Sequence, residues 1–224
     1  MKLLFLGTGA ADYNPETDGN TEGYRRNSSA LIDGKILIDP GPCVFDAIKT
    51  FKVNAENIKY VINTHRHSDH FNRKTLSALQ EMGAEFIELE DNKTVQIGGY
   101  EIIALKGNHS IPVQHFLIDD GKSRLFYGLD SAWIMYDEIQ AIKAKTVDFA
   151  VLDATIGFVE GDYRIFEHCS LNMLIEIKKS LTNHIKRLCA SHLAKTLHPN
   201  HNTVCETLKP YGIEVAFDGL EVEF

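Results

Sequence analysis

Cysteine is scarce in this sequence, and no two cysteines lie close together. The four are scattered along the 224 residues without a C-x-x-C spacing, at Cys43, Cys169, Cys189 and Cys205. This pattern excludes a cysteine-based zinc knuckle and gives no sign of a disulfide framework. We therefore expect reduced thiols and a cytoplasmic location.

Long apolar runs are also missing. Stretches such as residues 149–152 fall far short of the roughly 20 apolar residues that a membrane-spanning helix needs. Residues 1–7 are apolar apart from one lysine, but Asp12 and Glu16 follow soon after, which favours a first β-strand over a signal peptide. No membrane partner is expected.

Positive charge is in deficit. The chain carries 23 basic and 31 acidic residues, for a formal net charge of −8. It therefore lacks the general basic surface that binds nucleic acid, and nucleic acid is not an expected partner.

The remaining composition is that of an ordinary globular protein, with 44% apolar and 24% charged residues and no low-complexity linker or long repeat. We expect one domain over residues 1–224. Strand-like and helix-like patterns alternate in each half, which predicts an α+β fold of two mixed sheets packed face to face with helices outside. A long irregular loop is expected over residues 7–27. The other predicted elements are strands at 28–32, 35–38, 60–63, 113–118, 124–127, 149–153, 187–190, 213–217 and 221–224, further strands within 85–105, and helices at 44–51, 74–82, 136–144, 171–180 and 203–208.

A histidine-rich motif follows the predicted strand at residues 60–63. His65 and His67 lie two positions apart, so on an extended segment they point the same way and can hold one ion. Asp69 and His70 come directly after them and can turn toward a second position. Imidazole nitrogens combined with a carboxylate suit Zn²⁺, Mn²⁺ or Fe better than Ca²⁺ or Mg²⁺. The motif predicts a metal site, and the plain alternative is a solvated loop.

Three more candidate ligands stand at the ends of other predicted strands. His109 follows residues 103–108, Asp130 follows 125–129, and His192 follows 188–191. Taken singly, a strand-terminal histidine is more often a capped surface residue. Taken with the first motif, these residues predict convergence at one edge of the sheets, where strands hold a site rigidly.

Thr64 to His70 gives the pattern T-H-x-H-x-D-H, followed by a lone His, an Asp and a lone His. This order resembles the metallo-β-lactamase superfamily, which implies a four-layer αββα sandwich with a two-metal site at the sheet edge. The implied cofactors are two divalent transition-metal ions, Zn²⁺ or Mn²⁺, with Fe as a further candidate. Asp39 matches an early Asp of the family, which would orient a ligand histidine; otherwise it is a simple turn residue. The implied ligands are His65, His67 and His109 for one metal, Asp69, His70 and His192 for the other, and Asp130 as a bridge.

Further motifs narrow the resemblance within the superfamily. Residues 5–10 look like the opening of the ribonuclease Z and cyclic-phosphodiesterase branch, and residues 24–29, 168–172 and 214–221 are similar to the phosphoribosyl 1,2-cyclic phosphate phosphodiesterases. Those enzymes carry a structural zinc site that this sequence lacks, because residues 7–27 contain no cysteine and position 195 is Lys rather than His. The loop must therefore be held another way, and the same specificity need not apply.

Ribonuclease Z is the main rival resemblance, carried by Gly7-Thr8-Gly9 and by residues 153–155. Only residues 110–129 separate His109 from Asp130, which leaves no room for the tRNA-gripping arm of that family. A thioesterase or lactonase of the glyoxalase type is a third alternative, because the ligands alone do not exclude it. We expect a phosphoric diester hydrolase that acts on a small, cyclic or acyclic phosphodiester.

The ligand set predicts attack by a hydroxide shared between the two metals. His168 is the expected general acid. The alternative is a histidine at a helix N-terminus that faces water. Asp69 is also predicted to be catalytic. Arg25 and Arg26 are candidates to bind the substrate phosphate, although loop arginines commonly have no such role. His115 is expected to be structural. Homodimers are common in the family, so a homodimer is a further candidate state.

Overall fold

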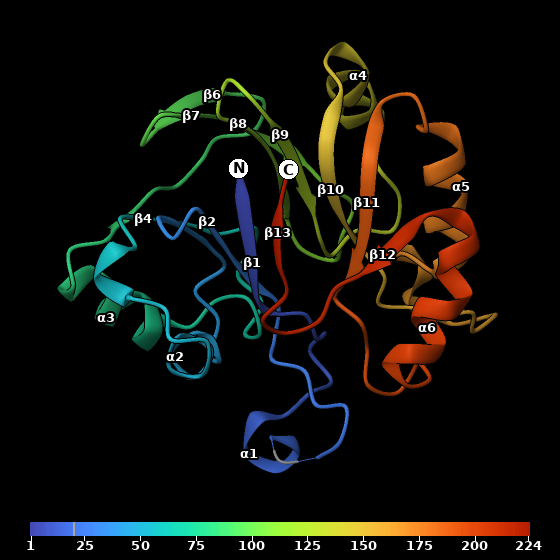
Figure 1. Cartoon of the computed structure of the whole chain (residues 1–224), viewed down its shortest axis with the longest axis horizontal. Helices are drawn as coiled ribbons and strands as arrows, with labels where there is room; N and C mark the ends of the chain where they lie inside the picture. Colours follow the sequence, from blue (N-terminus) through green and yellow to red (C-terminus); the bar gives the residue numbers. More distant parts are fainter. Residues whose placement is uncertain (20) are drawn as a thin grey trace.

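The computed structural model describes residues 1–19 and 21–224, which form two mixed β-sheets that pack face to face (Figure 1). The first sheet has the strand order β13-β1-β2-β3-β4-β5. Its strands are β1 (Lys2–Gly7), β2 (Ser29–Ile32), β3 (Ile36–Ile38), β4 (Tyr60–Ile62), β5 (Glu85–Phe86) and β13 (Glu221–Glu223).

The second sheet has the order β12-β11-β10-β9-β8-β7-β6, and its strands β9 to β12 run parallel. Its strands are β6 (Thr94–Ile97), β7 (Tyr100–Lys106), β8 (Gln114–Asp119), β9 (Arg124–Gly128), β10 (Val147–Asp153), β11 (Ile185–Ser191) and β12 (Ile213–Val215).

Helices cover the outer faces of both sheets, α2 and α3 on the first and α4, α5 and α6 on the second (Figure 1). The α-helices are α1 (Pro15–Asp18), α2 (Val44–Thr50), α3 (Arg73–Glu81), α4 (Tyr136–Ala144), α5 (Leu171–Ser180) and α6 (His201–Leu208). Short 3₁₀ turns are η1 (Ala55–Asn57), η2 (Tyr163–Phe166) and η3 (Lys209–Tyr211).

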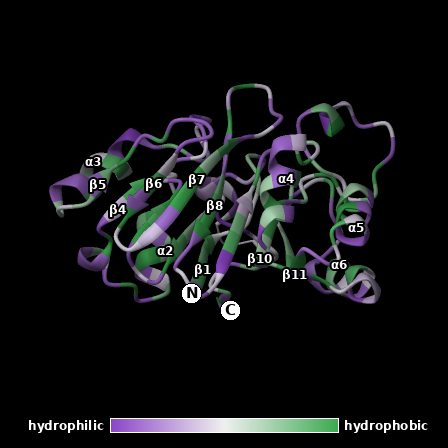
Figure 2. Ribbon diagram, turned by 90° about the horizontal axis from the view of Figure 1, so that it is seen from above, coloured by the Kyte–Doolittle hydropathy of each residue, from purple (hydrophilic) through white to green (hydrophobic). Residues whose placement is uncertain are grey.

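Successive side chains along a strand point to opposite faces of its sheet, so each strand contributes both to the core between the sheets and to the layer under the helices. In β1, Leu3 and Phe5 enter the core between the sheets, whereas Leu6 packs beneath the helices of the first sheet. Seen from above, the central strands are largely hydrophobic, and hydrophilic residues gather in α3 and the loops (Figure 2). The αββα fold class predicted from the sequence is confirmed.

Two details go beyond the sequence-based expectation. The loop at residues 7–27 contains α1, which begins after Asn14 because the Asn14 side chain accepts a hydrogen bond from the Glu16 amide. Asn20 of that loop lies outside the described residues. The last two strands are both present, but β12 joins the second sheet and β13 the first, so the turn at Asp218 crosses between the sheets. That residues 1–224 form one domain stays a prediction.

None of the helices found in residues 1–19 and 21–224 is long and apolar enough to cross a membrane.

The sheet topology brings several strand ends together. Strands β9, β10 and β11 run parallel, and β7 has the same direction as β9 because both are antiparallel to β8. Their carboxyl ends therefore meet at one edge of the second sheet, and β4 of the first sheet ends just before His65.

Candidate metal centre

All seven predicted metal ligands lie in close clusters at this edge. In each cluster, one donor atom per residue lies within 4.8 Å of the donor atoms of the others. The clusters are His65, His67 and His109; Asp69, His70 and His192; His65, His70 and Asp130; and Asp130, Asp153, His168 and His192.

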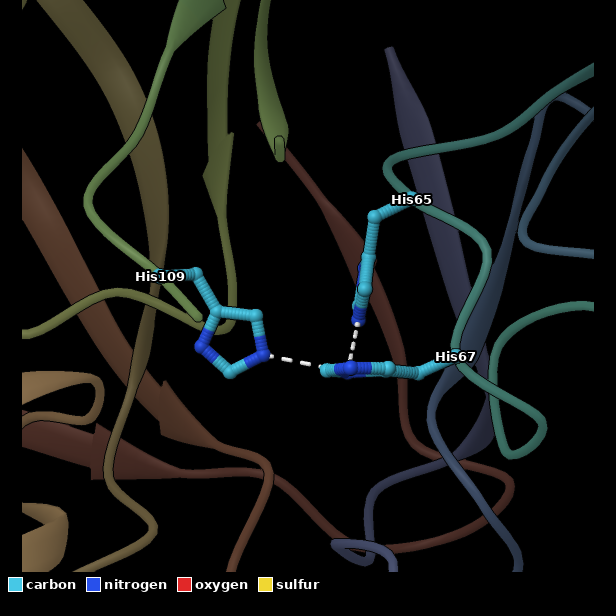
Figure 3. Close-up of side chains that lie close together, drawn as sticks. All are labelled: His65, His67 and His109. Carbon is cyan, nitrogen blue, oxygen red and sulfur yellow. Dashed lines mark hydrogen bonds between the residues drawn. The ribbon is translucent and has the colours of Figure 1, made fainter. Parts of the chain in front are cut away.

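The first cluster is a triangle of three imidazoles (Figure 3). His67 Nδ1 lies 3.0 Å from His65 Nε2 and 3.1 Å from His109 Nε2. Burial lowers the pKa of His65 to about 2 and also lowers the pKa of His109. Neutral rings offer lone pairs, which is the form in which histidine binds a metal.

The second cluster surrounds His70, which is fully buried. His70 Nε2 lies 3.3 Å from Asp69 Oδ2 and 3.2 Å from His192 Nε2. Asp130 stands between the two clusters: its Oδ2 is 3.0 Å from His70 Nε2, and its Oδ1 is 3.8 Å from His109 Nε2. This is the position that a bridging carboxylate needs.

The donor set fits a metal centre on an observation independent of the sequence pattern. Asp130 Oδ2 is buried and forms no hydrogen bond with the described residues, although His70 Nε2 lies 3.0 Å away. A bare buried carboxylate oxygen is unfavourable unless a cation or a donor satisfies it. Nitrogen and carboxylate donors around that oxygen suit borderline transition metals such as Zn²⁺, Mn²⁺ or Fe.

Asp39 contacts His70 on the ring nitrogen that faces away from the second cluster. Its Oδ2 accepts a hydrogen bond from His70 Nδ1 at 2.7 Å, which keeps a hydrogen on Nδ1 and makes Nε2, which faces the cluster, the nitrogen that a metal would bind. Its Oδ1 accepts from the Thr64 amide at 2.7 Å and from Asn63 Nδ2 at 2.8 Å. Asp39 thus has the contacts expected of a residue that orients His70.

His168 lines the same cleft, with a side chain only 13% exposed. Its Nδ1 lies 2.8 Å from Asp153 Oδ2, and its ring stacks on His192 at 5.6 Å between centroids. Burial opposes a charge on this ring, but Asp153 outweighs it and raises the pKa of His168 to about 9. His168 is therefore anchored in the site rather than turned to water.

Asp153 and Thr155 lie in the site but are not among the site residues predicted from the sequence. Thr155 Oγ1 lies 2.7 Å from His192 Nδ1 and 3.1 Å from His168 Nδ1, so it contacts both rings. Asp153 ends the buried strand β10, which is the signal that identified the other strand-end candidates. Applied to every strand, that signal would have found it.

The cleft above these residues has a volume of about 250 Å³. Arg164 and Glu167 of the 157–168 loop line it, and neither is among the residues predicted from the sequence. Arg164 Nε and Nη2 donate to the two carboxylate oxygens of Asp162, at 2.9 and 2.6 Å. No apolar period marks this loop, so sequence patterning gives little signal for Arg164.

Arg25 and Arg26 do not line the metal cleft. Arg26 pairs with Asp46 at 2.7 Å and with Asp218 at 3.5 Å. Arg25 is buried, donates to Thr8 Oγ1 at 2.7 Å, and faces a larger pocket of about 980 Å³ that contains none of the seven predicted ligands. Their role in substrate binding stays a prediction.

The loop between β1 and β2 is held by polar contacts, in line with the expectation that it is fixed without a structural zinc. Lys195 Nζ pairs with Asp18 Oδ1 at 2.6 Å. Asp12 accepts from the amides of Lys195 and Thr196, at 2.8 and 3.0 Å. An ion pair and backbone hydrogen bonds thus join the loop to the segment after His192.

Comparisons with known proteins bear on the family and the fold of the chain. The family model of the metallo-β-lactamase superfamily matches residues 23–72, which include Asp39 and the His65–His70 motif. No match to a curated protein was found.

Several solved structures share the fold along the whole chain. A diphosphatase of the PhnP family is 19% identical, with a TM-score of 0.76, and the match covers 100% of this chain and 97% of that one. The metallo-β-lactamase fold protein YhfI from Bacillus subtilis is 17% identical, with a TM-score of 0.79, and covers 100% and 99%. The short form of human tRNase Z is 17% identical, with a TM-score of 0.71, and also covers 100% and 99%. The chain therefore has the metallo-β-lactamase fold, and the resemblance to that superfamily is confirmed.

Proposed function

We propose that this protein is a two-metal hydrolase that cleaves a small phosphodiester. The observation that carries the proposal is Asp130, whose buried Oδ2 lacks a hydrogen-bond partner among the described residues while the carboxylate stands between two clusters of nitrogen and oxygen donors. A single metal would leave one of these clusters without a cation. A structural relative with the same fold is a diphosphatase, which supports chemistry at phosphorus.

His65, His67 and His109 would hold one ion, and Asp69, His70 and His192 the other, with Asp130 shared. Two bound divalent ions would lower the pKa of bound water and neutralise charge on phosphoryl oxygens. The protein's own contribution is to hold the seven donors in place. The catalytic role of Asp69 beyond its place in the second cluster stays a prediction.

His168 would donate a proton to the leaving oxygen. Its Nδ1 is held by Asp153 and Thr155, which leaves Nε2, without a partner among the described residues, as the nitrogen that can give up a proton. Asp153 holds the ring in place and favours its protonated form. A positioned acid of this kind contributes typically about 10²- to 10⁴-fold to the rate.

Arg164 would bind a charged group of the substrate beside the scissile bond. Asp162 fixes the guanidinium in a bidentate pair and leaves Nη1 without a partner among the described residues. The side chain is 30% exposed and lines the metal cleft. The guanidinium is thus held in place, and its remaining Nη1 donor suits a phosphate or carboxylate oxygen. The cleft volume of about 250 Å³ favours a small molecule over a polymer.

A tRNA 3′ endonuclease of the ribonuclease Z type is the second candidate, favoured by the full-length structural match to human tRNase Z. A glyoxalase-type thioesterase or lactonase is the third, because the same donors could serve acyl chemistry. The acidic chain and the short segment between His109 and Asp130 favour the small phosphodiester. The cytoplasmic location and the homodimer stay predictions.

A substrate panel tests the proposal. Protein reconstituted with Zn²⁺ or Mn²⁺ is assayed on 1,2-cyclic phosphodiesters, an aryl phosphodiester, a thioester, a lactone and precursor tRNA. We expect about two metal ions per chain and turnover of the small phosphodiesters. Efficient 3′ processing of precursor tRNA, or turnover of only the thioester or lactone, would reverse the assignment.

Two variants identify the residues involved. We expect His168→Ala to lower kcat on the small phosphodiester by about 10²-fold or more while the metal content stays unchanged. His184→Ala, in the turn before β11, is the matched histidine control and should behave as wild type. Loss of metal in His168→Ala would make His168 a ligand rather than the acid.

A further inference from the structure

His115 and Glu138 form a buried pair that the proposed chemistry does not use. His115 lies on β8 and Glu138 on the first turn of α4, and both side chains are at most 1% exposed. His115 Nδ1 lies 2.5 Å from Glu138 Oε1. A buried ion pair of this kind gives little net stability compared with apolar residues of similar volume, so its presence calls for another reason.

Both ring nitrogens of His115 face acceptors. Nδ1 faces the Glu138 carboxylate, and Nε2 lies 2.9 Å from the carbonyl oxygen of Leu129. Neither acceptor carries a hydrogen if the carboxylate is ionised, so a ring that satisfies both contacts donates from both nitrogens and carries a positive charge. Burial opposes that charge, but Glu138 outweighs it, and the pKa of His115 is raised.

The carbonyl that His115 holds belongs to the residue just before Asp130. Asp130 has a φ of 55°, in the left-handed region that non-glycine residues rarely adopt. A fixed Leu129 carbonyl restrains the rotation of the peptide unit that leads into Asp130. The contact therefore restrains the orientation of the carboxylate that stands between the two donor clusters.

The same ring also packs against the strand that leads to His109. A Cβ at Gly107 would lie 2.7 Å from Cε1 and Nε2 of His115, and a Cβ at Gly128 would lie 3.1 Å from its Nδ1. Gly107, directly after β7, and Gly128, the last residue of β9, thus leave space for the ring. β8 lies between β7 and β9, so this one side chain contacts both of the strand ends that lead to His109 and Asp130.

Hydrogen bonds also join the segment after β7 to the segment after β9. The Asn108 amide donates to Ser131 Oγ at 2.9 Å, and the Ala132 amide donates to the Asn108 carbonyl at 3.1 Å. Glu138 Oε2 accepts from the Met135 amide at 2.6 Å, which ties the end of the Asp130 loop to α4. Hydrogen bonds therefore connect the His115–Glu138 pair with the segments that carry the predicted ligands His109 and Asp130.

We propose that His115 and Glu138 are positioning residues, which hold the ends of β7 and β9 so that His109 and Asp130 converge on the metals. This inference rests on the proposed function for its link to metal, but the contacts stand without it. Residues that support metal ligands from outside typically change metal affinity about 10- to 100-fold when replaced.

The test compares three variants of the full chain. His115→Phe keeps a ring but removes both donors, and Glu138→Gln keeps size but removes the charge. Tyr100→Phe is the matched control, because it removes a 2.5 Å hydrogen bond to Asp33 at the far end of β7. Each metal-free protein is titrated with Zn²⁺ or Mn²⁺ by calorimetry, and its thermal midpoint is recorded.

We expect the thermal midpoint to fall in all three variants. The dissociation constant for the more weakly bound metal ion should rise about 10- to 100-fold only in His115→Phe and Glu138→Gln. Metal binding within about twofold of wild type in Glu138→Gln, despite a lowered midpoint, would overturn the inference. If His115→Phe does not fold, Glu138→Gln decides.

Amide hydrogen exchange separates this inference from the proposed function. We expect faster exchange at residues 107–109 and 128–132 in His115→Phe and Glu138→Gln, but not in Tyr100→Phe, with no metal added. If wild-type protein binds no metal, the proposed function fails and the exchange result decides the positioning role. Unchanged exchange at both strand ends would refute that role.

Discussion

Replacing Asp39 by Asn tests whether the metal centre depends on the tautomer of His70. The Asp39 carboxylate accepts from the Thr64 amide and Asn63 Nδ2 on one oxygen and from His70 Nδ1 on the other. An amide can place its single oxygen on only one side. The side facing two nitrogen donors is favoured, because the opposite choice leaves both of those donors unpaired.

The amide NH₂ group of the variant would then face His70 Nδ1. To accept that hydrogen bond, the ring must move its own hydrogen to Nε2, which is the nitrogen 3.3 Å from Asp69 Oδ2 and 3.2 Å from His192 Nε2. A protonated Nε2 cannot bind a metal. We therefore expect the second metal to bind about 10- to 100-fold more weakly, which corresponds to about 1.4–2.7 kcal/mol.

Stability should fall as well, because a hydrogen bond to a charged group contributes about 1.5–3 kcal/mol. For a chain of this size, the loss lowers the thermal midpoint of the metal-free protein by roughly 3–12 °C. Asp33→Asn is the control, because Asp33 also has a left-handed φ, 47°, and accepts hydrogen bonds from Lys2 and Tyr100. Calorimetric metal titration and thermal unfolding measure both effects.

The reasoning fails if Asp39→Asn lowers the thermal midpoint but binds both metals as wild type does. It also fails if Asp33→Asn weakens the metal equally, since the effect would then follow from general destabilisation.

Three other outcomes are expected. Arg164→Ala should raise KM by about tenfold with kcat nearly unchanged, because a substrate anion is bound equally in ground and transition states; a lower kcat at constant KM would contradict this. Lys195→Ala should lower the thermal midpoint slightly and leave metal content intact, and loss of metal would show that the ion pair supports the site. The raised pKa of His115, set by Glu138 with a smaller contribution from Asp130, gives stability that is complete below about pH 6.5 and is lost as pH rises through the folded pKa. Urea unfolding from pH 5 to 9 should therefore show the advantage of wild type over the double variant His115→Phe/Glu138→Leu, which leaves no buried carboxylate, shrinking as pH rises, and a constant or growing advantage would refute it.

Much of the fold could be predicted from the sequence because the strands are short apolar runs with clear ends. Residues 60–63 and 149–153 carry this pattern, and both correspond to strands, β4 and β10. The partners of the last two strands could not be predicted in this way. Residues 213–217 and 221–224 look alike in sequence, yet they join different sheets, because the packing of whole sheets decides which edge each strand meets.

The donor clusters could be predicted for a similar reason. Parallel strands end at a common edge, so a His or Asp at each end is brought together by topology alone. The residues around the clusters could not be predicted so well. Arg25 and Arg26 looked like anion binders, but an arginine has the same sequence appearance whether its partner is Asp218 or a substrate.

The backbone conformation of the site residues explains why local sequence patterns do not predict the geometry of the ligands. Six non-glycine residues have a positive φ in the described structure, and three of them are Asp39, Asp130 and His192. Local preference opposes this conformation, so the surrounding contacts must impose it. For Asp39 these contacts come from residues 63, 64 and 70, and for Asp130 they include the carbonyl held by His115. The ligand geometry is thus a property of the assembled sheets, and changes that leave all seven predicted ligands in place should still weaken metal binding.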